Sequence, residues 1–97
     1  MSAIDTHYLA LIHKDPASGY GISFPDVPGV IAVADSLDDA ISEAAAALDF
    51  AFEDWQGPLP QPRTLDQLRA DAEFLAASAD AVIAAIRPSP SYYAAAE

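Results

Sequence analysis

The chain has 97 residues, of which 15 are Asp or Glu and 4 are Lys or Arg, so its formal net charge is -11. This length fits one small domain with little margin of stability, and so acidic a surface repels nucleic acid and anionic membranes while it suits a basic partner. With no Cys, no long apolar run and no basic leader before an apolar segment, the sequence predicts a soluble cytoplasmic protein without disulfides.

The first third of the chain predicts three short strands. Residues 8–13 form an apolar run that is typical of a strand buried on both faces. Residues 15–19 contain Pro and Gly, which suit the backbone angles of a hairpin turn. Residues 20–24 alternate large apolar and small side chains, as a strand does. Two prolines in residues 25–29 end that strand, and the β-branched residues in 30–34 indicate a third one.

A long helix is expected next, beginning after Ser36 and ending at Gly57 and Pro58. Ser36 with Asp39 three residues later resembles a capping box. The apolar residues that follow are spaced by three or four and form one helical stripe. They are Leu37, Ile41, Ala44, Leu48, Phe52 and Trp55. Phe50 lies off this stripe, so it is either exposed or covered by the second helix or by a partner.

The remainder of the chain predicts a shorter helix and an ambiguous last element. Thr64 and Gln67 form a second capping signature, followed by an apolar stripe of Leu65, Leu68, Ala72 and Leu75. Residues 81–86 fit either more helix, because of their alanines, or a fourth strand, because of Val and Ile. The fold expected is α+β: a small antiparallel sheet of three or four strands with a long and a short helix on one face. Residues 1–88 form the domain, and residues 89–97 form a flexible tail.

The residues do not indicate catalysis or a cofactor. His7 and His13 are the only histidines, and about 20 Å along a strand separates them, too far to share a metal ion. A two-metal nuclease needs carboxylates inside its strands, whereas the carboxylates here gather near turns and at the helix start. The sequence also lacks a Gly-rich phosphate loop and a basic patch.

The charge pattern points to a protein partner. Glu53 and Asp54 lie in the last turn of the long helix, at the negative end of its dipole, and nothing basic nearby in sequence offsets them. A cationic partner would compensate this placement, although solubility alone also explains an acidic surface. The predicted partner-binding residues are Asp26, Asp38, Asp39, Glu43, Phe50, Glu53 and Asp54.

Three segments of the sequence form a specific combination: residues 19–29 (Gly-Tyr-Gly-Ile-Ser-Phe-Pro-Asp-Val-Pro-Gly), residues 35–41 and the Leu-Pro-Gln-Pro linker at 59–62. Through these segments, residues 8–88 resemble the HicB antitoxins of bacterial toxin–antitoxin pairs. It implies a partial RNase-H-like fold of three antiparallel strands, a helix, a shorter helix and a fourth strand. It therefore favours a strand for residues 81–87, and it implies that the acidic centre of RNase H is missing.

The resemblance implies a function as well. HicB-type antitoxins bind and inhibit a HicA-type toxin, a small basic ribonuclease, and an acidic inhibitor suits such a partner because complementary charge speeds encounter. An orphan HicB-like scaffold that self-associates is the alternative, and a relict nuclease is a third. Many HicB antitoxins carry a C-terminal DNA-binding module, but the last residues here contain no basic recognition element. Direct operator binding is therefore not expected.

Self-association is also predicted. A sheet of three or four strands exposes its edges unless something covers them, and the candidate edges are residues 30–34 and 81–87. A thin, Ala-rich core leaves Phe50, Trp55, Tyr92 and Tyr93 as apolar area to bury. We expect a homodimer, with a tetramer as the alternative, despite charge repulsion that salt would screen.

Overall fold

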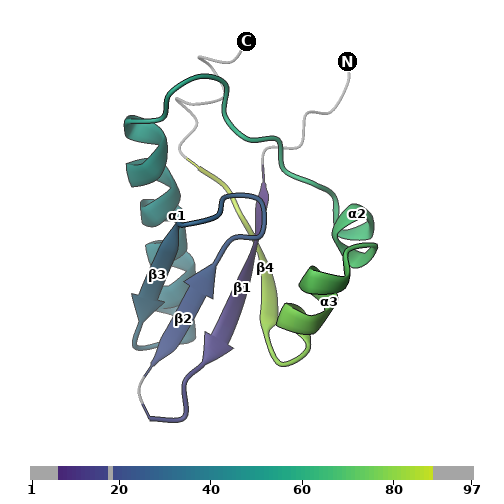
Figure 1. Ribbon diagram of the computed structural model, residues 1–97. Coiled ribbons are helices and arrows are strands. Elements are labelled where there is room, and N and C mark those ends of the chain that lie inside the picture. Colours follow the sequence, from purple (N-terminus) through teal and green to yellow (C-terminus); the bar gives the residue numbers. More distant parts are fainter. Residues whose placement is uncertain (1–6, 18, 89–97) are drawn as a thin grey trace.

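The computed structural model describes residues 7–17 and 19–88 (Figure 1). The elements are β1 (Tyr8–Lys14), β2 (Tyr20–Ser23), β3 (Ile31–Ala34), α1 (Leu37–Glu53), α2 (Leu65–Arg69), α3 (Ala72–Ser78) and β4 (Val82–Ile86). The strands form one antiparallel sheet in the order β3-β2-β1-β4. The α+β class and the fourth strand are confirmed, and both candidate edge strands lie at the edges. The predicted tail at 89–97, with Tyr92 and Tyr93, lies outside the described residues.

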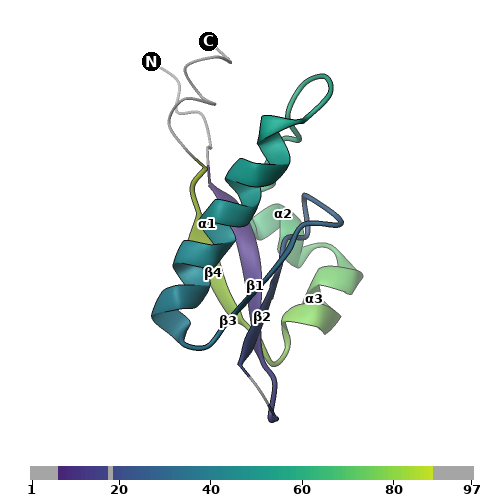
Figure 2. The ribbon, with the colours of Figure 1, turned by 90° about the vertical axis from the view of Figure 1, so that its left-hand side faces the viewer.

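The helices cover both faces of the sheet rather than one. Tyr8, Ala10 and Ile12 of β1 are buried in the core that α1 covers. The residues between them, Leu9 and Leu11, pack with side chains of α2 and α3. Figure 2 shows α1 on one side of the sheet and α2 with α3 on the other. The predicted one-face arrangement is therefore wrong, because a strand that is apolar at successive positions needs cover on each face.

The inner face of α1 is built largely from small side chains. Ser36 caps the helix as predicted, since its side chain accepts a hydrogen bond from the Asp39 N–H at 3.1 Å. The buried residues of α1 are Ala40, Ala44, Leu48 and Phe52. Ile41, predicted to lie on the buried stripe, is 41% exposed, and Ala40 takes that place. Alanine at these contacts lets the helix approach the sheet closely, which a bulkier side chain would prevent.

The predicted second helix is two short helices. The capping box at Thr64 is confirmed: the Gln67 N–H donates to Thr64 Oγ1 at 3.1 Å, and the Thr64 N–H donates to Gln67 Oε1 at 2.8 Å. Asp71 ends the helical run by capping α3, with its Oδ1 accepting from the Glu73 N–H at 2.9 Å. This break changes the helical phase, so Phe74 is buried while Leu75 is 51% exposed. No helix of the described ranges is both long and apolar enough to cross a membrane.

Gly19 is required by close packing at the hairpin between β1 and β2. A Cβ atom at this position would overlap the carbonyl oxygen of Ala34 at the end of β3. Because a backbone atom cannot move aside as a flexible side chain can, we expect Gly19→Ala to lower the free energy of unfolding by about 1–3 kcal/mol.

Gly21→Ala is the matched control for this prediction, since no heavy atom lies within 4 Å of a Cβ added there. In a strand, replacing Gly by Ala reduces the entropy of the unfolded chain, so this variant should be neutral or slightly more stable. Chemical denaturation of both variants compares them. Equal unfolding free energies for Gly19→Ala and the parent would show that the hairpin tolerates the added methyl group.

Candidate partner-binding surface

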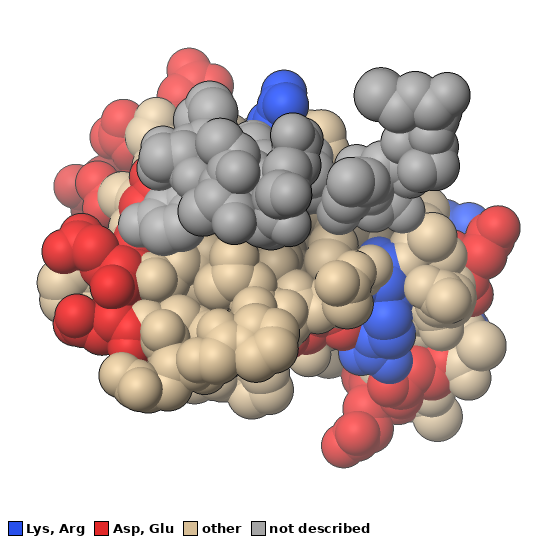
Figure 3. Space-filling view, turned by 90° about the horizontal axis from the view of Figure 1, so that it is seen from above, with Lys and Arg blue, Asp and Glu red and all other residues tan. Residues whose placement is uncertain are grey.

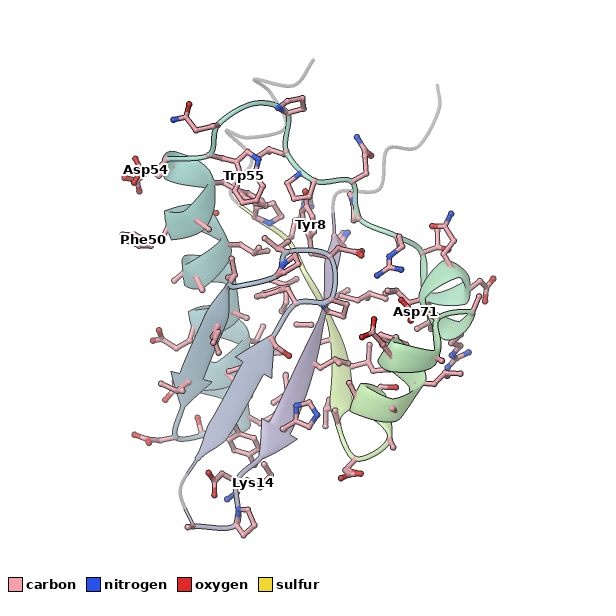
Figure 4. All side chains as sticks on the ribbon, in the orientation of Figure 1. Tyr8, Lys14, Phe50, Asp54, Trp55 and Asp71 are labelled. Atoms are coloured by element: carbon pink, nitrogen blue, oxygen red, sulfur yellow. The ribbon has the colours of Figure 1, made fainter. Side chains whose placement is uncertain are left out.

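The side of α1 that points away from the sheet carries most of the predicted partner-binding residues. Asp39, Glu43, Phe50 and Glu53 are all exposed, and their spacings of four, seven and three place them on one side of a helix. Asp54 follows Glu53 at the C-cap of the helix. Figure 4 shows Phe50 and Asp54 pointing outward, away from the sheet. We call these five residues the α1 outer face. Asp38, also exposed, lies beside it in the first turn.

The α1 outer face combines an apolar side chain with uncompensated negative charge. Phe50 is 74% exposed. Among residues 7–17 and 19–88, no ion pair engages any carboxylate of the α1 outer face. The last turn of the helix contains no basic residue, as the sequence indicated, so Glu53 and Asp54 face the negative end of the helix dipole. Seen from above, red carboxylates gather on the side of the molecule that α1 forms (Figure 3).

Asp26 differs from the other predicted residues because its carboxylate is already bound. It lies in the loop between β2 and β3, and its side chain is only 8% exposed. Its two oxygens accept hydrogen bonds from the Arg63 side-chain Nε at 2.6 Å and from the Arg63 backbone N–H at 2.7 Å. Arg63 Nη1 also donates to Asp71 Oδ2 at 3.2 Å. Asp26 thus joins its loop to the linker and to the start of α3, rather than contributing to the α1 outer face.

Sequence reasoning missed Arg63. Its partner Asp26 is 37 residues away in the chain, so no local pattern links them. The available signal was composition: one of only 4 cationic residues stands in the linker of a chain with 15 carboxylates. Such a residue is expected to form an ion pair with a carboxylate. In the folded chain, the loop at 25–29 supplies this carboxylate through Asp26.

Asp71, which shares Arg63 with Asp26, makes folding stability depend on pH. The hydrogen bond with Asp26 is the largest cause that raises the pKa of Arg63. The pKa of Asp71 is lowered from 3.8, first by the Glu73 N–H and then by Arg63. A group with a depressed pKa in the folded state stabilises that state above its unfolded pKa and loses this effect as the pH falls. The Asp71 contribution is therefore present at neutral pH and disappears below about pH 3.8.

We expect Asp71→Asn to be less stable than the parent at pH 7 and to lose less stability on acidification. Asn still caps a helix well, so the substitution removes mainly the charge. The matched control is Asp66→Asn, which changes an exposed carboxylate in the first turn of α2. Urea denaturation at pH 7 and at pH 3 measures the difference. If Asp71→Asn and the parent lost the same unfolding free energy between pH 7 and pH 3, the stabilising role of the Asp71 charge would be contradicted.

His13 takes part in packing α3 against the sheet, and it also lines the open cleft beside the β1–β2 hairpin. His13 Nε2 lies 2.8 Å from the carbonyl oxygen of Ala77, so its ring holds α3 against the sheet. The described ranges contain no group of three or more His, Cys, Asp or Glu side chains that could hold a metal ion. The cleft lies between the β1–β2 hairpin and the start of α1, where Asp35 and Glu43 line it together with Tyr20. It extends the negative surface of α1 towards the sheet.

Comparison with known proteins identifies the family. The sequence profile described as "HicB_like antitoxin of bacterial toxin-antitoxin system" matches residues 8–92. No curated protein matches the chain significantly.

Solved structures agree. The antitoxin HicB of Burkholderia pseudomallei is 28% identical, with a TM-score of 0.70 over 90% of this chain and 66% of that one. The separate N-terminal domain of that antitoxin is 29% identical, with a TM-score of 0.67 over 86% of this chain and 98% of the domain. The chain thus spans about two thirds of the full HicB.

A third structure, a HicA3 and HicB3 toxin-antitoxin complex, contains a chain of the same fold. Its identity is 22% and its TM-score 0.67, over 87% of this chain and 99% of that one. At this identity the likeness concerns the fold. The profile match covers most of the chain and agrees with the fold and with the signature at residues 19–29. The chain belongs to the HicB-like antitoxin family of bacterial toxin–antitoxin systems.

Proposed function

We propose that this protein is a non-enzymatic antitoxin that binds a basic HicA-type ribonuclease through the α1 outer face and covers its active site. The observation that carries the proposal is the exposed Phe50 among carboxylates that no cation of the described residues neutralises. The family and the toxin-antitoxin complex among its structural relatives support the choice of partner.

The chemistry of the α1 outer face suits such a partner. An exposed aromatic ring can fill a pocket and supply much of the binding energy of an interface. Carboxylates around it attract a cationic surface and raise the association rate, while they repel acidic proteins. Asp26 is left out of this surface because Arg63 occupies it, although it was among the predicted partner-binding residues.

A neutralisation assay tests the proposal. A HicA-type toxin is purified, and its cleavage of RNA is followed while the chain is added. We expect cleavage to stop near one equivalent of chain per toxin. The chain alone should leave RNA intact with or without Mg²⁺ or Mn²⁺. Metal-dependent cleavage that persists through repurification, or a toxin that stays active in excess chain, would contradict the proposal.

A self-associating scaffold is the second candidate, and the edge strand β4 favours it. Val82 is 51% and Ile83 36% exposed there, which leaves apolar area at a sheet edge for another copy. Light scattering at physiological salt, combined with the neutralisation assay, separates the two functions. A homodimer or tetramer without toxin binding would support the scaffold. A mass of 10.2 kDa at all concentrations would contradict self-association.

A further inference from the structure

The outer edge of β3 is an apolar, uncharged strand on an acidic protein. β3 ends the sheet, and its four residues are Ile, Ala, Val and Ala. Ile31 is 70% and Val33 74% exposed, and with Phe50 they are the most exposed large apolar side chains of the described residues. Natural edge strands usually carry a charge, a proline or a bulge that discourages further pairing. The four residues of β3 include no charged residue and no proline.

The directions of the backbone groups in the sheet follow from the β1–β2 hairpin. The Asp15 N–H donates to the carbonyl oxygen of Gly19 at 2.9 Å, so these two residues form a hydrogen-bonded pair. Bonded and non-bonded pairs alternate along an antiparallel ladder. Gly21 and Ser23 therefore bond to β1, and Ile22 between them bonds to β3.

The same alternation assigns the free backbone groups of β3. Ile22 is paired with Ala32, so the N–H and C=O groups of Ala32 face β2. Its neighbours Ile31 and Val33 must then direct their N–H and C=O groups away from the sheet. No strand of the described residues pairs with this side of β3, so Ile31 and Val33 present both backbone groups and exposed β-branched side chains to an incoming strand.

The side chains next to Ile31 and Val33 on the same face of the sheet are small. On β2, Ser23 is paired with Ile31 and Gly21 with Val33, so the neighbours on this face are small. No heavy atom lies within 4 Å of a Cβ built at Gly21. The layer of α2 and α3 packs against β1 instead, through Leu11. Side chains of an added strand would therefore find room next to Ile31 and Val33.

Charge selects the occupant of this edge. Asp35 directly follows β3, and α1 packs against β3, as the side view in Figure 2 shows. Antiparallel pairing with a second copy would place two acidic α1 helices on the same face of one extended sheet. Their carboxylates would repel each other, whereas a basic protein would gain from them.

We propose that β3 accepts a strand of the basic toxin, which extends the sheet by β-augmentation. This inference rests on the proposed function and specifies how the partner binds. Backbone groups of the added strand bond to Ile31 and Val33, and the apolar side chains of both residues pack against it. The α1 outer face contacts cationic side chains of the same partner beside the added strand.

The test replaces Val33 by Pro, with Val33→Thr as the matched control. Proline is tolerated at an edge where the N–H points to solvent, and it removes one proposed donor without breaking the bonds to β2. Thr keeps the N–H and the β-branched shape. For the purified toxin, Val33→Pro should raise the Kd roughly tenfold, the cost of about one hydrogen bond. Val33→Thr should stay close to the parent.

Hydrogen exchange of the unmodified chain gives a second measurement that does not depend on the folding of Val33→Pro. The amide protons of Ile31 and Val33 should exchange fast in the free chain and slowly in the toxin complex. Toxin binding that leaves both amides in fast exchange would overturn strand addition but not the antitoxin function. Protection that appears without toxin and grows with chain concentration would assign the edge to a second copy. An absence of toxin binding would contradict the proposed function itself.

Discussion

Replacing Glu53 and Asp54 by Lys is expected to slow association with a HicA-type toxin by about 10- to 100-fold at low salt. Each substitution changes the charge by two, so the net charge goes from -11 to -7 (-11 + 4). Both positions lie on the exposed end of α1, where no described cation pairs with them. The effect should shrink as salt is added, because exposed charges are screened. Stopped-flow kinetics at several salt concentrations measures both the rate and its salt dependence.

Two controls separate binding from folding and from net charge. Lys in the last turn of a helix interacts favourably with the dipole, so the double variant should be as stable as the parent or slightly more stable. Replacing the exposed carboxylates Asp66 and Glu73 by Lys changes the net charge equally on the layer of α2 and α3. If this second pair slowed association as much as the first, charge in general, and not the α1 outer face, would direct the encounter.

Asp26→Ala is expected to lower the free energy of unfolding by about 2–3 kcal/mol. Charge-assisted hydrogen bonds contribute about 1.5–3 kcal/mol each, and Asp26 accepts two from Arg63 with a side chain that is only 8% exposed. The Arg63 side chain is 39% exposed, so water can rehydrate its guanidinium when Asp26 is removed. The two bonds would sum to about 3–6 kcal/mol, and this rehydration brings the expected loss to the lower end of that range or just below it.

Chemical denaturation of Asp26→Ala, Arg63→Ala and the double variant checks this by a double-mutant cycle. The sum of the two single losses should exceed the loss in the double variant, because each single substitution removes the same bond between Arg63 Nε and Asp26 Oδ1. Asp38→Ala, at an exposed position, serves as the control. The association rate with the toxin should change little in Asp26→Ala. If Asp26→Ala had the unfolding free energy of the parent but associated slowly with the toxin, Asp26 would belong to the partner-binding surface after all.

Much of the fold was readable from local sequence patterns. Ser36 and Thr64 cap their helices where the sequence placed them, since capping depends on side chains three residues apart. The layer arrangement was mispredicted although a signal existed: Leu9 and Leu11 alternate with the buried Tyr8, Ala10 and Ile12 in β1. Because both alternating sets of side chains are apolar, each face of the sheet needs a covering layer of helices. The break at Asp71 was also misread, because Asp inside an apolar stripe was not recognised as a cap.

The candidate site was predictable only where it lies on one element. The α1 outer face follows from helical periodicity, since Asp39, Glu43 and Phe50 lie on the side opposite to the buried Leu48. The Asp26–Arg63 pair and the free backbone of β3 depend on how distant segments meet. The sequence predicts β3 at a sheet edge, and the structure confirms this position. Which backbone groups of β3 are free depends on its register with β2, which no local pattern gives.

The pairing of β1 with β4 has a consequence for synthesis on the ribosome. β1 lies inside the sheet, and its partner on one side, β4, follows it by some seventy residues, with Tyr8 opposite Ile86. Until β4 leaves the ribosome, one edge of β1 is unpaired and Ile86 is missing from the core around Tyr8 and Ile12. Contacts so distant in sequence form late and slowly. A nascent chain interrupted before residue 82 therefore exposes an open, apolar strand to proteases, whereas the finished chain closes it.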